Sequence, residues 1–345
     1  MEEGISVIIC CFNSSLRLKP TLEHLYLQKN IDINQWEIIL IDNGSTDKTA
    51  EKATEIWQSF PLPKPSFKVV FEEKPGLSFA RIKGIAESKF KFVLFCDDDN
   101  WLEHYYLSNA LTIMGSSKDI GALGGIGTPV FENKEPPYFW INQFHTLAVG
   151  AQSDKEGDIT NGRGVLYGAG MVLNKVGFER LLKEFDFEFQ ASDRVGDSLS
   201  SSGDHELCLA LRKIEYKIYY SKNLSFKHYI PEKRTTIKYY KSLFYSFGKS
   251  AAYLLVYFVD SSNQNSIKND YRYICMRCGK IIIQSWLTLL FAGYYVGLNK
   301  YKYLHYLHYL YDNIGMFKVL LSRKNIHRSI FKEKSLFQFL RKDKC

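Results

Sequence analysis

Three consecutive carboxylates stand directly after a short apolar run. Asp97, Asp98 and Asp99 follow the segment Phe92-Val-Leu-Phe-Cys96. Like charges this close repel one another and raise each other's pKa unless a cation is near. A hard divalent ion such as Mg²⁺ or Mn²⁺ would relieve that repulsion, because it prefers oxygen ligands and keeps phosphates and waters in its shell. The triplet is therefore a candidate metal site, with a solvated acidic turn as the alternative.

Three further side chains have the chemistry to bind a nucleotide. Asp42 could accept a hydrogen bond from a base N–H, with an Asx turn or a cap as the alternative. Arg81 and Lys83 follow Gly76 at the start of a predicted helix, where cations and the helix N-terminus favour phosphate. A basic surface turn is the alternative for the two cations.

A second group of candidates lies further along the chain. Asp204, in Ser202-Gly-Asp-His-Glu206, opens a predicted helix and is either a helix cap or a general base. His228 and Arg234 could be a metal ligand and a diphosphate clamp, although a lone histidine is more often structural. The CxxC spacing of Cys275-Met-Arg-Cys278 has no second pair, so no zinc site is assigned.

The first 130 residues predict the elements that would position these side chains. Apolar, β-branched runs at 5–10, 36–41, 67–71 and 90–96 read as strands, with helical periodicity between them. Ser45 or Thr46 can cap the helix that follows the second run. This alternation predicts βαβ units and a parallel sheet, with ligands beyond the carboxyl ends of its strands. Because Asn13, Asp42 and the 97–99 triplet follow such strands, we expect them to meet at one edge.

Beyond residue 130 the pattern is looser. Residues 132–164 read as loop with short elements, and Leu166 to Leu173 predicts a strand that carries Gly168-Ala-Gly170. After Lys233 the chain reads as helical, aromatic and basic.

Composition and charge limit the function classes. With 345 residues, 46% hydrophobic, the chain is too apolar to be disordered, and seven Cys favour a reducing compartment over a disulfide scaffold. Residues 212–345 carry 25 Lys and Arg against 7 Asp and Glu, whereas the residues before them are acidic overall. The basic part suggests an anionic membrane surface or a nucleic acid, but the acidic front argues against a nucleic-acid-binding protein.

Ile281 to Leu298 is an uncharged stretch of 18 residues. It only just reaches the length of a membrane span and contains polar residues. We expect an interfacial helix here, with a plain core helix as the alternative. The acidic start, Met1-Glu-Glu-Gly4, is not typical of a secretory signal.

A series of motifs, taken together, resembles the family 2 glycosyltransferases of GT-A fold over residues 4–235. They are Ile8-Ile-Cys-Cys-Phe-Asn13, Ile41-Asp-Asn-Gly-Ser-Thr-Asp47, Pro75-Gly-Leu-Ser-Phe-Ala-Arg81, Asp97-Asp-Asp99, Gly168-Ala-Gly170 and Gly203-Asp-His-Glu206. The resemblance implies an α/β fold with a Rossmann-like, mostly parallel central sheet flanked by helices and followed by a helical extension. It also implies an inverting transfer from a nucleotide-diphosphate sugar, with UDP as the expected nucleotide, to a hydroxyl of a glycan or lipid-linked glycan in surface polysaccharide biosynthesis.

The resemblance further implies roles for individual residues. Phe12 and Asp42 would contact the base, Arg81 the nucleotide side, and Asp97 the ribose. Asp99 would bind a Mn²⁺ or Mg²⁺ ion, and the nucleotide-sugar group also includes Asn13, Lys83 and Asp98. The acceptor side would be lined by Gly168, Ala169, Gly170 and Met171, and Asp204 would be the general base. Gly203 stands where relatives usually have Glu, which leaves Asp204 as the one base candidate there. No Gln-x-x-Arg-Trp motif occurs, which favours a single addition over a polymerase.

We therefore expect a catalytic domain at 1–235, with a nucleotide-sugar half (1–130) and an acceptor half (131–235). Residues 236–345 would form a basic aromatic helical region that holds a cytoplasmic enzyme at the inner face of the plasma membrane. A helical support or oligomer interface is the alternative for that region. A non-catalytic nucleotide-sugar-binding scaffold is the rival function; a sugar-nucleotide pyrophosphorylase is disfavoured because Cys11 to Ser15 lacks the Gly-rich loop of those enzymes.

Overall fold

A computed structural model describes residues 1–133, 143–189, 202–257, 275–287 and 300–321, with the single positions 137, 140, 199 and 290. The chain divides into two compact units. Unit 1 comprises Met1–Glu135, Asn142–Glu184 and Leu207–Pro231, and unit 2 comprises Pro136–Ile141, Phe185–Glu206 and Glu232–Cys345.

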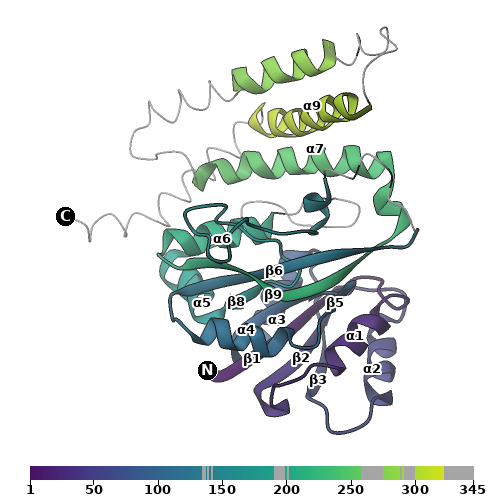
Figure 1. The fold of residues 1–345 in the computed structure, drawn as a ribbon, viewed down its shortest axis with the longest axis vertical. Coiled ribbons are helices and arrows are strands. Elements are labelled where there is room, and N and C mark those ends of the chain that lie inside the picture. Colours follow the sequence, from purple (N-terminus) through teal and green to yellow (C-terminus); the bar gives the residue numbers. More distant parts are fainter. Residues whose placement is uncertain are drawn as a thin grey trace, which may run out of the picture. The chain divides into compact units, whose positions relative to one another are not determined.

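Unit 1 is built on a mixed sheet whose strands run in the order β3-β2-β1-β4-β8-β6-β9-β5 (Figure 1). Its strands are β1 (Glu2–Cys11), β2 (Trp36–Asp42), β3 (Ser66–Phe71), β4 (Phe90–Asp97), β5 (Asn100–Leu102), β6 (Ile120–Phe131), β7 (Gly157–Asp158), β8 (Val172–Asn174) and β9 (Lys217–Ile230). The first four strands pair in parallel, and β8 is antiparallel to both β4 and β6. This arrangement confirms the predicted α/β class with a mostly parallel central sheet.

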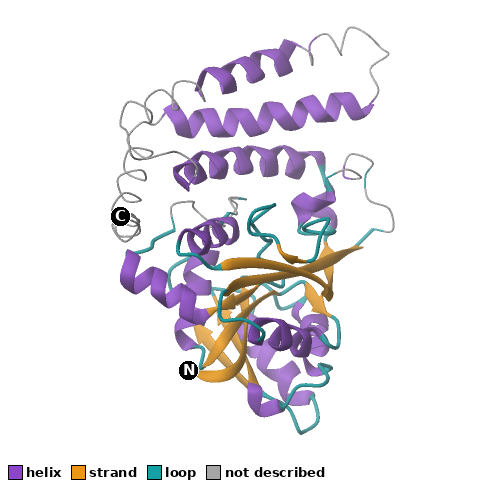
Figure 2. Cartoon of the chain, turned by 60° about the vertical axis from the view of Figure 1, so that its left-hand side comes forward, coloured by secondary structure: helices purple, strands orange, loops and turns teal. Residues whose placement is uncertain are grey.

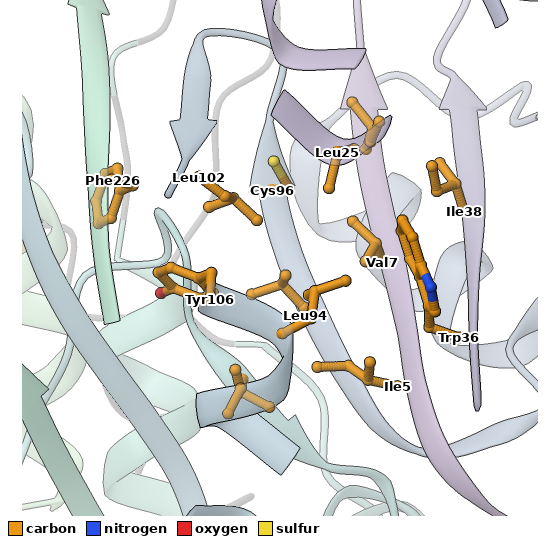
Figure 3. Packing of buried hydrophobic residues seen from close by; sticks show 14 of the residues in the cluster. Ile5, Val7, Leu25, Trp36, Ile38, Leu94, Cys96, Leu102, Tyr106 and Phe226 are labelled. Carbon is orange, nitrogen blue, oxygen red and sulfur yellow. The ribbon is translucent and has the colours of Figure 1, made fainter. Parts of the chain in front are cut away.

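Helices of unit 1 connect these strands. They are α1 (Leu18–Tyr26), α2 (Thr49–Ser59), α3 (Leu77–Glu87), α4 (Tyr106–Gly115), α5 (Lys175–Phe185) and α6 (Gly203–Lys213), with 3-10 turns at Ile33–Gln35 and Phe144–Leu147. The last residue of α5 and residues 203–206 of α6 belong to unit 2. The main core lies where α1, α2 and α4 pack their apolar sides against strand residues such as Val7, Trp36 and Leu94 (Figure 3). Strands β1 and β2 are apolar along most of their length because both faces of the sheet are covered.

Two boundaries differ from the sequence prediction. The strand expected over Leu166 to Leu173 is wrong, because only Val172–Asn174 pairs, and the glycine segment before it forms a turn. Gly170 adopts φ 71°, a left-handed conformation that breaks a strand. Helix α2 begins at Thr49, later than a cap at Ser45 or Thr46 would place it, because those residues bind the loop after β1 instead.

Within unit 2, the described residues after Lys233 are almost entirely helical, as predicted. Its helices are α7 (Ile237–Leu254), residues 275–287 and α9 (Lys300–Leu321), with 3-10 turns at Glu232–Thr235 and Leu255–Tyr257. Helix α9 lies between α7 and the 275–287 helix (Figures 1 and 2). Helices α7 and α9 approach closely through glycines, since a Cβ on Gly248 would overlap the Asp312 carbonyl oxygen and one on Gly315 would overlap that of Tyr245.

Among the described helices none has the length and apolarity needed to cross a bilayer. Of the uncharged stretch 281–298, residues 288–289 and 291–298 lie outside the described residues. The domain boundary expected at 235/236 stays a prediction.

Candidate functional site

The strand ends of unit 1 bring the predicted carboxylates to one edge of the sheet. In the strand register Cys11 is the partner of Asp42 on β2, and Cys10 is the partner of Asp97 on β4. Asp42 and Asp97 therefore lie on either side of β1, about 10 Å apart at the usual strand spacing. The expected meeting of Asp42 and Asp97 at this edge, called the carboxylate edge below, is confirmed for their backbone positions.

The Asp98 carboxylate is bound by protein groups. Arg17 Nη2 lies 2.6 Å from Asp98 Oδ2, and Ser14 Oγ donates to the same oxygen. Thr21 Oγ1 donates to the Asp98 carbonyl oxygen at 2.9 Å. Burial and the neighbouring Asp99 carboxylate raise the pKa of Asp98, while Arg17 and Ser14 oppose that shift. Asp98 thus ties the end of β4 to the start of α1.

Asp99 faces the histidine predicted as a metal ligand. His228 Nε2 lies 3.4 Å from Asp99 Oδ1, and both side chains are buried. The contact exists because β5 pairs with β9 in a register that places Asn100 opposite His228. Tyr229 N also donates to the Asp99 carbonyl oxygen at 2.9 Å, and Asn100 Nδ2 donates to Asp99 Oδ1 at 3.3 Å.

This pair fits part of a divalent-cation site. A carboxylate and an imidazole nitrogen suit Mn²⁺, which takes its remaining ligands from phosphates and water. Within the described parts of the chain no cluster of three or more His, Cys, Asp or Glu side chains is arranged to hold a metal. A metal ion held by Asp99 and His228 would therefore take its further ligands from water and from the phosphate groups of a bound substrate.

The loop after β1 is fixed to the loop after β2. Asn13 has φ 52°, and its Oδ1 accepts from Thr46 N at 2.8 Å, while its backbone N donates to Ser45 Oγ at 3.0 Å. Asp42 Oδ1 accepts from Ser45 N, three residues on, at 3.0 Å, which is the spacing of a cap. Phe12 is 53% exposed beside these groups. Phe12, Asn13 and Asp42 thus belong to one joined pair of loops.

The two predicted cations on α3 have different surroundings. The α3 start is held near the end of β2, because Gly76 N donates to Asn43 Oδ1 at 2.7 Å. Arg81 is buried, and its guanidinium lies 4.9 Å from the Phe95 ring centre on β4. Lys83 lies in a surface ion pair, 3.4 Å from Glu87. Arg81 faces the sheet, whereas Lys83 has the surroundings of a surface lysine.

The segment Gly168 to Met171 lies beside β4. Gly170 N donates to the Phe95 carbonyl oxygen and Phe95 N donates to that of Met171, both at 2.9 Å. Tyr106 Oη donates to the Gly170 carbonyl oxygen at 2.6 Å. Since Phe95 is two residues before Asp97, this segment, Ala169 included, lies near the carboxylate edge.

Asp204 and Arg234 belong to unit 2. Asp204 is half-buried in the first turn of α6, and its Oδ1 accepts from His205 N at 2.9 Å. Arg234 lies in the 3-10 turn Glu232–Thr235. Their assigned roles stay predictions.

Sequence reasoning missed four residues that shape this edge: Ser14, Arg17, Asn100 and Tyr106. Ser14 and Arg17 directly follow the Asn13 loop, and Asn100 directly follows the acidic triplet, so position in the chain was an available signal for these three. Tyr106 carried no such signal, because its partner Gly170 is 64 positions away.

Comparisons with known proteins identify the family of the chain. The model of glycosyl transferase family 2 matches residues 6–181, just over half of the chain. EpsH of Bacillus subtilis, named as a glycosyltransferase, is 29% identical over 117 residues, which are 34% of this chain and 32% of EpsH. The cholesterol galactosyltransferase of Borreliella burgdorferi is 36% identical over 100 residues, 29% of this chain and 26% of that protein. The matched region thus spans about a third or less of these relatives.

Among solved structures, the S. aureus TarS fragment in complex with UDP-GlcNAc is similar, with a TM-score of 0.49 and 17% sequence identity. The alignment covers 93% of this chain and 91% of that one.

Proposed function

The chain belongs to glycosyl transferase family 2, and we propose that it transfers a sugar from a nucleotide-diphosphate donor to a hydroxyl group of a glycan or lipid-linked glycan. UDP-sugars are the first donors to test, and surface polysaccharide biosynthesis is the proposed setting. The name of one matched relative, a galactosyltransferase for the membrane lipid cholesterol, supports an acceptor carried by a lipid.

The observation that carries the proposal is the contact between Asp99 and His228 at the carboxylate edge. These two buried side chains lie 3.4 Å apart, and Asp99 is two residues beyond Asp97, the last residue of β4. We propose that they hold Mn²⁺ or Mg²⁺. When bound, that ion supplies positive charge opposite the diphosphate that leaves.

The nucleotide would lie over the joined loops after β1 and β2. Phe12 offers an exposed ring for stacking on the base, and Asp42 offers its second carboxylate oxygen, Oδ2, to a base N–H. Arg81 supplies a cation on the helix that starts beside Asn43, and Asp97 receives the ribose hydroxyls. Lys83 is a second cation of the nucleotide-sugar group, and Arg234 would be a diphosphate clamp.

The transfer itself needs a base and an acceptor position. Gly168 to Met171, held against β4 by backbone hydrogen bonds, would line the acceptor side. Asp204 would take the proton of the acceptor hydroxyl. The acceptor oxygen then forms a bond to the anomeric carbon, and the bond from that carbon to the diphosphate oxygen breaks with its electron pair on the diphosphate. Attack from the opposite face inverts the anomeric centre.

We further propose a single addition per acceptor and a cytoplasmic location at the inner face of the plasma membrane. Both follow from the sequence: the Gln-x-x-Arg-Trp motif is absent, and the C-terminal part is basic.

A donor panel with Mn²⁺ tests the proposal. We expect one donor to give metal-dependent release of nucleoside diphosphate, and Asp99→Asn to reduce it at least about a hundredfold, the range of lost electrostatic stabilisation. Asp119→Asn is the matched control, because Asp119 is an exposed carboxylate paired with Lys217 at 3.7 Å. Donor binding in a thermal-shift assay without release by any donor would favour the scaffold instead.

A further inference from the structure

The helix at residues 275–287, together with the helical residue Leu290, turns an apolar side to solvent. Its large exposed side chains are Met276 (68%), Ile283 (61%), Trp286 (56%), Leu287 (48%) and Leu290 (55%). Four of them, at positions 276, 283, 287 and 290, are separated by seven, four and three residues, so they lie on one side of a helix. Trp286 borders that side. We call these five residues the 276–290 face.

The opposite side of the same helix already has partners. Cys278 and Ser285, seven residues apart, are buried at 3% and 2% exposure. Cys278 packs in a cluster with Ala252 of α7 and Leu320 of α9, and its Sγ lies 3.3 Å from Met316 Sδ. The helix is therefore held in unit 2 by its other side, and the 276–290 face takes no part in that packing.

The charges next to the 276–290 face are positive. Arg277 and Lys280 are exposed on this helix. The sequence contains no Asp or Glu between Asp270 and Asp312. Apolar side chains with an interfacial Trp, bordered by cations and without acids, form a surface complementary to anionic lipid headgroups and the acyl chains beneath them.

We propose that the 276–290 face binds an anionic lipid bilayer, with the helix lying in the plane of the interface. A second copy of this face fits it less well, because a two-fold contact would oppose Arg277 and Lys280 to themselves with no acid on the segment to pair with them. The benefit to catalysis, a lipid-linked acceptor kept close to the enzyme, rests on the proposed function. The lipid contact itself does not.

Vesicle flotation of the full chain tests the proposal. We expect binding to vesicles of equimolar phosphatidylcholine and phosphatidylglycerol, weaker binding to phosphatidylcholine alone, and a decrease with salt. Ile283→Glu should lower the partition coefficient at least about tenfold. It removes an apolar side chain that the bound bilayer would bury, and it adds a charge that the anionic surface repels. Arg277→Gln with Lys280→Gln should remove most of the preference for phosphatidylglycerol.

Leu62→Glu is the matched control, because Leu62 is 81% exposed in unit 1 and the substitution is the same in kind. It should leave flotation unchanged, and circular dichroism should show all variants folded. Equal flotation of wild type and Ile283→Glu would overturn the proposal. So would wild-type self-association that Ile283→Glu abolishes, without vesicle binding. Donor hydrolysis in the absence of lipid is measured on the same samples: its failure with intact flotation rejects the proposed function and leaves the lipid contact standing.

Discussion

Replacing Arg17 by Met isolates one charge contact at the carboxylate edge. The guanidinium lies 2.6 Å from Asp98, whose side chain is 9% exposed, whereas that of Arg17 is 33% exposed. Arg17 also donates to the carbonyl oxygens of Asn13 at 3.1 Å and Phe12 at 3.3 Å. The substitution keeps most of the side-chain length and removes these charge-assisted contacts.

The expected loss of stability lies between two limits. Removing one partner of a fully buried ion pair costs about 3–5 kcal/mol, and an exposed pair contributes about 0–1 kcal/mol. Because a third of Arg17 is in solvent, water screens part of the contact, and we expect about 2 kcal/mol. That corresponds to a fall of about 4–8 °C in the unfolding midpoint of a domain of this size.

The loss should depend on pH with a definite sign. Burial and Asp99 raise the pKa of Asp98 in the folded chain, and removing Arg17 raises it further. Above that pKa the variant buries a carboxylate that has lost its cation, so the full loss is present near neutral pH. As the pH falls through the pKa of Asp98 in the folded chain, the carboxyl takes up a proton. The difference in unfolding midpoint between variant and wild type (the Arg17→Met gap) then narrows.

Unfolding midpoints measured at about pH 7.5 and at about pH 3, which is below the ordinary pKa of an aspartate, check this. Arg180→Met is the control, since Arg180 forms an exposed pair with Glu184 at 2.8 Å and should lose at most about 0.5 kcal/mol at either pH. An Arg17→Met gap of the same size at both pH values, or one no larger than that of Arg180→Met, would refute the electrostatic explanation.

Two further predictions concern unit 2. Gly248→Ala should destabilise unit 2 by about 3 kcal/mol, because the added methyl group overlaps the α9 backbone. Gly279→Ala is the control: a Cβ there has no atom within 4 Å, so the substitution should be neutral or slightly stabilising. Thermal unfolding compares the two variants. Burial raises the pKa of Asp312 to about 6, above its ordinary value, so stability should fall as the pH rises from about 4 to about 6. Asp312→Asn should accordingly raise the midpoint at about pH 7.5 and leave it unchanged at about pH 4, and an equal shift at both would contradict this origin.

The sequence predicted the framework of unit 1 because its signals are local. The apolar runs around Val7, Ile39 and Leu94 each specify a buried strand from adjacent residues. A carboxylate that directly follows such a run must lie at the carboxyl edge, which is why Asp42 and Asp97 were placed correctly. Turn chemistry was harder to predict, as the positive φ of Gly170 and the late start of α2 illustrate.

What each carboxylate does at that edge was decided by the tertiary structure. Asp97, Asp98 and Asp99 are equivalent in sequence, yet Asp98 meets Ser14 from 84 positions away, and Asp99 meets His228 because β5 pairs with β9. The exposed side of the 275–287 helix was likewise fixed only by its packing on α7 and α9. Hydrophobic periodicity depends on neighbours along the chain, whereas the partner of a buried charge depends on which strands the fold sets side by side.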